Sequence, residues 1–259
     1  MESTGQFAGQ VAVITGAAKG IGAATAQAFQ REGAKVALLD LDPAGEELAR
    51  SLGKAATFIR CDVSQSADVD AAFKAIAQRF GFVDVLVNNA GIQHYGTVTE
   101  TSDEEWDRVI SVNLKSAFLC AKRAILLMAS RPRGVVINLA SVQAFVSQTQ
   151  VAPYTTSKTA LLGLTRSIAV DYAPKIRCVA ICPGTVDTPM LRDAIAKSPD
   201  PNAVYQECVA MHPVKRVGTP EEIAELVLYL SGPHAGFITG QAIRIDGGLG
   251  LSIGGSKRD

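Results

Sequence analysis

The sequence lacks an excess of either charge. Its 259 residues include 25 Lys and Arg and 25 Asp and Glu, which gives a formal net charge of zero. Domains that bind nucleic acid usually carry a basic excess, and so do segments that bind anionic membrane surfaces. The composition therefore argues against a nucleic-acid partner and against a membrane-surface partner.

The sequence also lacks paired cysteines, metal-binding spacing and long apolar runs. Its five cysteines include no C-x-x-C pair, and its three histidines are scattered. No stretch reaches the ~18 apolar residues of a membrane-spanning helix, and the first residues show no basic and apolar leader. We expect reduced thiols, no metal centre, no membrane span and a cytoplasmic location.

Short apolar runs alternate with longer helical stretches along the chain. Uninterrupted apolar strands are typical of a sheet covered on both faces, and the alternation predicts right-handed βαβ crossovers. The fold class is therefore α/β, a Rossmann-like doubly wound parallel sheet with helices on both faces. No repeat or linker interrupts the chain, so we expect one domain over 1–259. The expected strands are Val11–Ile14, Lys35–Leu39, Ala56–Arg60, Val83–Val87, Val135–Leu139, Arg177–Ile181 and Gln241–Ile245.

One segment, approximately 187–217, departs from this alternation. It follows a strand and contains Pro189, Pro199, Pro201 and Pro213, so it reads as an irregular excursion. A long excursion at the carboxyl end of a strand is a typical place for a substrate lid. A plain surface insertion is the alternative.

A glycine-rich segment joins the first expected strand to the first helix. It contains Gly16, Lys19, Gly20, Ile21 and Gly22. Glycines permit a tight turn and a close backbone approach to a pyrophosphate, and the helix N-terminus offers free N–H groups. The spacing G-x-x-x-G-x-G has no G-K-[ST] ending, which disfavours an ATP-hydrolysing loop.

An acidic residue ends the second strand. Asp40 lies 24 residues after Gly16, near the ~20 expected for the acid that holds the adenosine ribose. A carboxylate there would accept hydrogen bonds from both ribose hydroxyls and repel a 2′-phosphate, which favours NAD over NADP. Lys19 favours the opposite choice, since a cation in this loop could pair with a 2′-phosphate.

Four polar residues suggest proton transfer. Tyr154 and Lys158 are four residues apart on an expected helix and share one face. A free tyrosine has a pKa of about 10, and a nearby ammonium favours its phenolate form. Ser141 could hold a substrate oxygen, and Asn113 could hold a water that links Lys158 to solvent.

Together these motifs resemble the short-chain dehydrogenase/reductase family. The resemblance rests on the glycine loop, Asn88-Asn89-Ala90-Gly91, Ser141, Tyr154-x-x-x-Lys158 and Pro183-Gly184, and it spans about 10–248. It implies a seven-stranded sheet and a catalytic tetrad at Asn113, Ser141, Tyr154 and Lys158. It also implies a homotetramer in which the Ser102–Ala129 and Tyr154–Tyr172 helices pair across one interface, and the Pro220–Leu230 helix and last strand form another.

The resemblance implies further contacts with a nicotinamide cofactor. Asp62 and Val63 would meet adenine, and Lys158 would also hold the nicotinamide ribose. The remaining cofactor residues implied in this way are Asn89, Ala90, Gly91, Tyr154, Pro183, Gly184, Val186 and Thr188.

Amide and imidazole side chains near the tetrad predict a polar substrate. The expected substrate contacts are Gln93, His94, Ser141, Gln143, Gln150 and Tyr154. Each such group left unpaired would cost about 1–3 kcal/mol, so a sugar or polyol fits better than a steroid or acyl chain. The sequence resembles aldose 1-dehydrogenases and L-fucose-type dehydrogenases of the family. A 3-oxoacyl-thioester or other ketone reductase is the alternative, and a dinucleotide-binding sensor is the non-enzymatic one.

Overall fold

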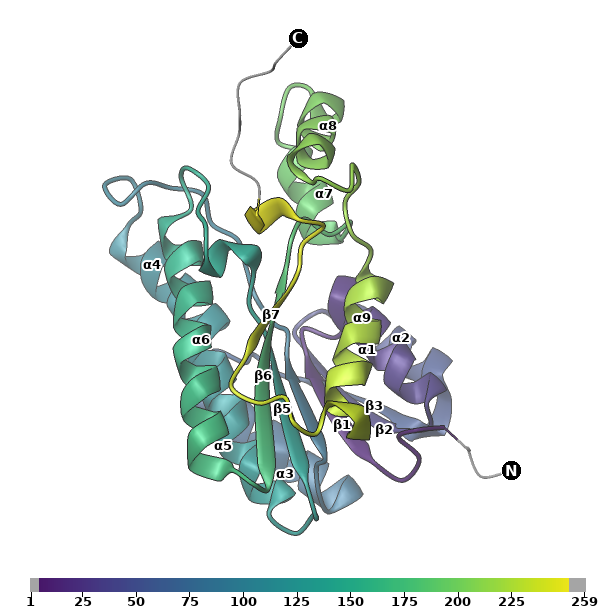
Figure 1. Ribbon diagram of the computed structural model, residues 1–259. Helices are drawn as coiled ribbons and strands as arrows, with labels where there is room; N and C mark the ends of the chain where they lie inside the picture. Colours follow the sequence, from purple (N-terminus) through teal and green to yellow (C-terminus); the bar gives the residue numbers. More distant parts are fainter. Residues whose placement is uncertain (1–4, 252–259) are drawn as a thin grey trace.

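The computed structural model describes residues 5–251 (Figure 1). Its centre is a seven-stranded sheet in the order β3-β2-β1-β4-β5-β6-β7, and every neighbouring pair is parallel. This confirms the predicted Rossmann-like class. The strands are β1 Val11–Thr15, β2 Lys35–Asp40, β3 Ala56–Arg60, β4 Val85–Asn88, β5 Gly134–Leu139, β6 Ile176–Pro183 and β7 Ala242–Ile245.

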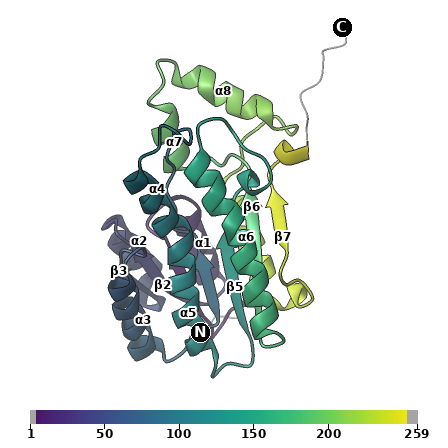
Figure 2. The same cartoon turned by 90° about the vertical axis from the view of Figure 1, so that its left-hand side faces the viewer.

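Helices cover both faces of the sheet, as Figures 1 and 2 show. One apolar core joins α1 and α9 to one face through residues such as Ile14, and the other joins α3 and α5 to the opposite face through Val13. Successive strand residues thus face opposite cores. The helices are α1 Gly20–Arg31, α2 Ala44–Leu52, α3 Ser66–Phe80, α4 Asp103–Ile110, α5 Ser116–Met128, α6 Ala152–Tyr172, α7 Pro189–Ile195, α8 Pro201–Met211 and α9 Pro220–Ser231.

The long helical region expected over Ser102–Ala129 contains an internal π-turn. Ser102 caps α4 in a reciprocal box with Glu105, and α4 then passes through a π-helical turn at Ser111–Lys115 into α5. Single π-turns inside α-helices are frequent at functional sites. The turn carries Asn113, one of the predicted tetrad residues.

The segment 187–217 is not irregular, contrary to the expectation from its prolines. Pro189 and Pro201 each stand at the start of a helix, α7 and α8, behind the caps Thr188 and Asp200. Proline suits the first helical turn because that position needs no backbone N–H donor. Two of the four prolines therefore begin helices within the segment that the sequence predicts to be irregular.

The strand order reverses direction at β1 and β4, which are neighbours in the sheet. Ligands of doubly wound sheets bind in the crevice at the carboxyl ends of such strands. Here Asn89, directly after β4, donates from Nδ2 to the carbonyl oxygens of Thr15 and Gly16 at 3.0 and 2.9 Å. The loops after the two strands are therefore fixed to each other. Within residues 5–251, no helix is long and apolar enough to cross a membrane.

Candidate active site

A cavity of about 520 Å³ opens at the carboxyl ends of the central strands. The glycine loop lies at one side of this cavity, and Tyr154 lies at the other. The predicted residues that line it are Gly16, Lys19, Gly20, Ile21, Asp40, Asp62, Val63, Asn89, Ala90, Gly91, Ser141, Tyr154, Lys158, Pro183 and Thr188. Sequence reasoning missed apolar and basic wall residues that carry no motif, among them Leu41, Ile92, Arg108, Val112 and Met190.

The glycine loop requires its glycines. Gly16 and Gly20 have φ values of +61° and +57°, a region that residues with a Cβ rarely adopt. A Cβ on Gly22 would lie 2.1 Å from the carbonyl oxygen of Gly16. The α1 helix begins at Gly20, and its cap residue Lys19 makes no side-chain cap bond. The first N–H groups of α1 are thus left for an anion, which the helix dipole also favours.

Acidic side chains stand at the end of β2. Asp40 Oδ2 accepts a 2.8 Å hydrogen bond from Ala18 N, and its Oδ1 accepts from Asp42 N at 3.0 Å. These bonds hold the Asp40 carboxylate against the glycine loop. Lys19 Nζ lies 3.4 Å from Asp42 Oδ2, and both side chains are well exposed. The cation that could attract a 2′-phosphate is therefore already beside a carboxylate.

Tyr154 and Lys158 lie one helical turn apart on α6. The Lys158 ammonium is 5.6 Å from the centre of the Tyr154 ring and donates to the carbonyl oxygen of Leu139 at 2.8 Å. Burial lowers the pKa of Lys158 to about 8. Burial also raises the pKa of Tyr154, and a side-chain hydrogen bond with Ser141 works in the opposite direction. The protein alone therefore does not make Tyr154 a phenolate near neutral pH.

Ser141 is placed by the end of β5 and the short turn that follows. Its Oγ accepts a hydrogen bond from Gln143 N at 3.1 Å and thereby caps the turn Val142–Ala144. The side chain is buried and lines the cavity beside Tyr154. Its hydroxyl shares a hydrogen bond with Tyr154. Because a hydroxyl can rotate, the same group can donate instead to a substrate oxygen in the cavity.

Asn113 is locked from two sides. Its Oδ1 accepts from Ile92 N at 2.8 Å, while its Nδ2 donates to Ile92 O at 3.0 Å and to Ser157 Oγ at 3.1 Å. A Cβ on Gly91 would lie 3.4 Å from both Asn113 Oδ1 and Lys158 Nζ. Asn113 is thus near Lys158, and its direct bonds hold the loop after β4 in place.

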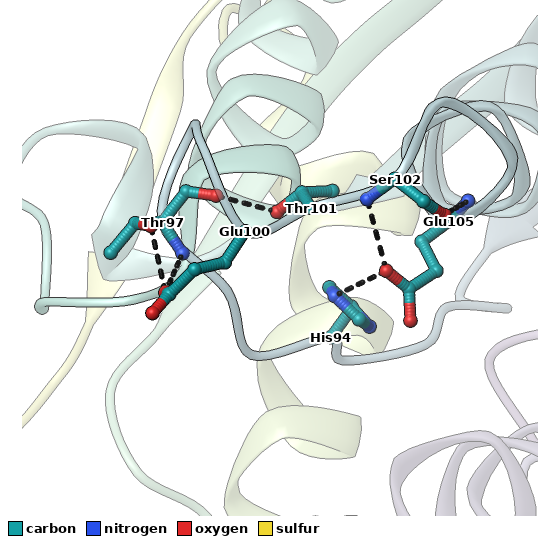
Figure 3. A network of polar contacts seen from close by, with 6 residues as sticks. All are labelled: His94, Thr97, Glu100, Thr101, Ser102 and Glu105. Atoms are coloured by element: carbon teal, nitrogen blue, oxygen red, sulfur yellow. Dashed lines mark hydrogen bonds and ion pairs between the residues drawn. The ribbon is translucent and has the colours of Figure 1, made fainter.

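The structure does not place the predicted substrate residues Gln93, His94, Gln143 and Gln150 in the cavity wall. Figure 3 shows His94 directed at Glu105, with Nε2 3.4 Å from its carboxylate. Gln143 bonds to Gln148 and Thr155, and Gln150 is exposed with a positive φ. Glu105 on α4 lies beside His94, and Thr155 on α6 and Gln148 bond to Gln143. Sequence proximity to the tetrad could not reveal these partners.

Three predicted cofactor residues likewise lie behind the cavity wall. Gly22 packs against Gly16, and Gly184 lies against Asp246 and His212. Val186 is buried and pairs with Gly218 in an isolated bridge. These residues support the wall instead of lining it.

The assembled groups fit a dinucleotide. The glycine cradle and the uncapped start of α1 suit a pyrophosphate, and Asp40 suits a ribose diol. Tyr154, Ser141 and Lys158 lie at the opposite side, where a hydroxyl or carbonyl could exchange a proton. Residues 5–251 contain no cluster of His, Cys, Asp and Glu side chains that could hold a metal ion.

Comparisons with known proteins agree with this chemistry. Residues 16–250 match a family model described as enoyl-(acyl carrier protein) reductase. The chain is 40% identical over 250 residues to dehydrogenase/reductase SDR family member 6 of Danio rerio, covering 95% of this chain and 100% of that one. It is 39% identical over 245 residues to 2-(S)-hydroxypropyl-CoM dehydrogenase 3 of Xanthobacter autotrophicus, covering 93% and 96%.

A solved structure is similar over nearly the whole fold. The ligand-free aldohexose dehydrogenase of Thermoplasma acidophilum superposes with a TM-score of 0.91 at 39% identity, covering 98% of each chain. These likenesses span the sheet, the glycine loop and the Tyr154–Lys158 helix. The chain belongs to the short-chain dehydrogenase/reductase family, whose members are oxidoreductases that act on CH–OH groups and bind nicotinamide cofactors.

Proposed function

We propose that the protein is an NAD-dependent dehydrogenase that oxidises a secondary or anomeric alcohol of a sugar or polyol. One observation carries the proposal. A single cavity has the Asp40 carboxylate at one side and Ser141, Tyr154 and Lys158 at the other. This arrangement suits a diol-bearing dinucleotide together with a hydroxyl that must lose a proton.

The preference for NAD follows from the charges at the end of β2. Two backbone N–H groups donate to the Asp40 carboxylate, so turning it away from a phosphate would break these two hydrogen bonds. Asp42 adds a second negative charge and occupies Lys19. A 2′-phosphate would meet like charge here, whereas a ribose hydroxyl would donate to it.

The chain's own residues would handle the proton. Ser141 would donate to the substrate oxygen, and Tyr154 would accept the hydroxyl proton. Lys158, charged below a pKa of about 8, would favour the phenolate form of Tyr154. When bound, the nicotinamide supplies the hydride acceptor. The positive charge of its ring, together with that of Lys158, would favour the phenolate form of Tyr154 and so oppose the effect of burial, which raises the pKa of Tyr154.

The proposed substrate class is supported by similarity to known proteins more than by the residues that line the cavity. The aldohexose dehydrogenase supports a sugar, and the hydroxypropyl-CoM dehydrogenase supports a small secondary alcohol. The enoyl-(acyl carrier protein) reductase description of the matching family model keeps an acyl-thioester reductase as the alternative. Asp40 argues against that alternative where it requires NADPH.

We also propose that the protein is a cytoplasmic homotetramer. Exposed apolar side chains on α5, α6 and α9 support an interface there, among them Phe118, Leu126, Val170 and Tyr229. Sedimentation would show a four-fold mass. A monomer would mean that these side chains face solvent.

Replacing Tyr154 with Phe tests the catalytic assignment. Calorimetric titration should give the same NAD affinity within about threefold, while turnover should fall by about a hundredfold to ten-thousandfold, because general-base transfer contributes about 10²–10⁴. Ser147→Ala, at an exposed position before α6, is the control and should keep full turnover. Substantial turnover by the Tyr154 variant would remove that residue from the mechanism.

A further inference from the structure

A buried histidine outside the tetrad bonds to the loop that follows β6. His212 is only 1% exposed, and it ends α8. Its Nε2 lies 3.1 Å from Thr185 N, and its Nδ1 lies 2.6 Å from the carbonyl oxygen of Cys208. Both ring nitrogens therefore have a backbone partner.

The two partners assign the tautomer. A carbonyl oxygen can only accept, so Nδ1 must carry the proton that bonds to Cys208. A backbone N–H can only donate, so Nε2 must be the acceptor for Thr185. The imidazole is therefore neutral and protonated at Nδ1 in this arrangement.

Backbone atoms of two loops approach the ring closely, and another part of its surroundings is a cavity of about 190 Å³ that His212 helps to line. A Cβ on Gly184 would lie 2.8 Å from Nε2, and a Cβ on Gly247 would lie 3.4 Å from Cδ2. The imidazole thus lies between the loop after β6 and the loop after β7. It joins the last turn of α8 to both loops.

The loop bonded to His212 leads directly into the cavity. Pro183 and Thr188, on either side of Thr185, both line the cavity, and Thr188 caps α7. A Cβ on Gly20 would lie 3.4 Å from Thr188 Cγ2, so this loop also faces the glycine loop. Moving Thr185 would therefore move a wall of the dinucleotide site.

We propose that His212 is a positioning residue for the cofactor: in its neutral form it holds the 183–188 loop in the conformation that binds the dinucleotide, and protonation releases that loop. This inference rests on the proposed nicotinamide site. A protonated Nε2 would face the N–H of Thr185 as a second donor, and the bond would be lost. Cofactor affinity should then fall as the pH falls.

Other charged groups surround the ring. The titratable and charged residues that bond to it or line the cavity beside it are Cys208, Lys215, Arg216, Glu222 and Asp246. The helix and the loop that His212 bonds to also carry Tyr205, Glu207 and Asp187, and Asp187 is paired with Arg192. Burial raises the pKa of Cys208, so its thiol stays neutral. The Arg216 hydrogen bond lowers the pKa of Glu222 to about 2, so that pair stays ionised at any pH above it. Asp246 accepts from Gly248 N and Gly250 N.

The test uses three variants of the full chain. His212→Gln keeps an acceptor near the Nε2 position but does not titrate, and His212→Leu removes the acceptor while keeping apolar volume. His234→Gln replaces an exposed histidine in the short helical turn before β7 and is the control. NAD dissociation constants would be measured by calorimetry from about pH 5.5 to about pH 8.5, where histidine changes charge.

The wild type and the His234 control should bind NAD about tenfold more weakly at the acid end, as expected for loss of one buried hydrogen bond. His212→Gln should show no such change, and His212→Leu should bind weakly at every pH. In steady-state kinetics, the KM for NAD should rise in His212→Leu while kcat stays within about twofold. An unchanged acid weakening in His212→Gln would overturn the proposal, as would wild-type affinity in His212→Leu.

A second measurement uses the wild-type protein alone, without cofactor and without any variant. Nitrogen chemical shifts of the histidine rings report which ring nitrogen carries the proton. At about pH 8, His212 should be neutral and protonated at Nδ1. If the neutral ring instead carries its proton at Nε2, the proposal that His212 holds the 183–188 loop is overturned, even if the protein binds NAD. Absence of NAD binding by the wild type, with the expected tautomer present, would instead count against the proposed function.

Discussion

Replacing Lys158 with Met should stabilise the folded protein at neutral pH while removing its activity. Lys158 is buried, and burial lowers its pKa from 10.5 to about 8. Each pKa unit corresponds to about 1.36 kcal/mol, so holding the charged ammonium in the folded protein costs about 3 kcal/mol at pH 7. Met keeps the length of the side chain without that cost.

The sign follows from proton binding. Below about pH 8 the ammonium is charged in both the folded and the unfolded chain, and the full cost of burial is present. Between about pH 8 and pH 10.5 the unfolded chain binds more protons, so the wild type gains stability as the pH rises. From pH 7 to pH 9.5 this gain amounts to roughly 2 kcal/mol. The variant lacks it.

The assay is urea unfolding of the wild type and the variant at several pH values, without cofactor. Loss of the Lys158 bond to the Leu139 carbonyl lowers the stability of the variant by a constant amount, so the pH-dependent part of the difference is the informative one. The advantage of the variant should shrink by roughly 2 kcal/mol between pH 7 and pH 9.5. Lys122→Met, at an exposed position on α5, should show no comparable trend. A pH-independent difference for Lys158→Met would refute the electrostatic account.

Three further predictions concern the scaffold around the site. Gly22→Ala should lose NAD affinity and stability, because its Cβ would lie 2.1 Å from the Gly16 carbonyl oxygen. Calorimetric titration and thermal unfolding measure the two effects, and normal NAD affinity would contradict the claim that the glycine loop binds the cofactor. Arg131→Ala should cost about 2–4 kcal/mol in urea unfolding, since it leaves the buried Asp84 carboxylate without its 2.6 Å partner; a change under about 0.5 kcal/mol would mean that backbone donors suffice. A thiol reagent should modify at most the half-buried Cys208 in the native protein, because burial raises the pKa of Cys61 and Cys178 to about 12; rapid reaction of a second thiol would show local opening.

Sequence reasoning recovered the sheet because each strand contains a short run rich in apolar residues. Each of the seven expected strands overlaps an observed one, and the sheet is parallel and doubly wound as expected. The four-residue spacing on a helix predicted that Tyr154 and Lys158 share one face, and the family resemblance implied that Ser141 lies beside them; all three line the observed cavity. These inferences depend on local periodicity, on rules of chain crossing and on the resemblance to the family.

The errors have a local and a tertiary source. Pro189 and Pro201 were placed in an irregular excursion, yet the adjacent residues Thr188 and Asp200 cap the helices that these prolines begin, which is a local signal. The other errors arose where tertiary partners decide the outcome. His94 was expected in the substrate pocket, but Glu105, a residue of the α4 capping box, lies beside it. The bonds of His212 to Thr185 and Cys208 also lay beyond sequence reasoning, because they join a helix end to a distant strand end.

The most direct test of the central claim is the absorbance of reduced nicotinamide, followed with NAD or NADP over a panel of aldoses, polyols and secondary alcohols. The charges at Asp40 and Asp42 predict a signal with NAD and little or none with NADP. The proposed substrate class predicts that an aldose or polyol gives it. Reaction only with NADPH and a ketone or acyl thioester would contradict the account of both the cofactor and the substrate.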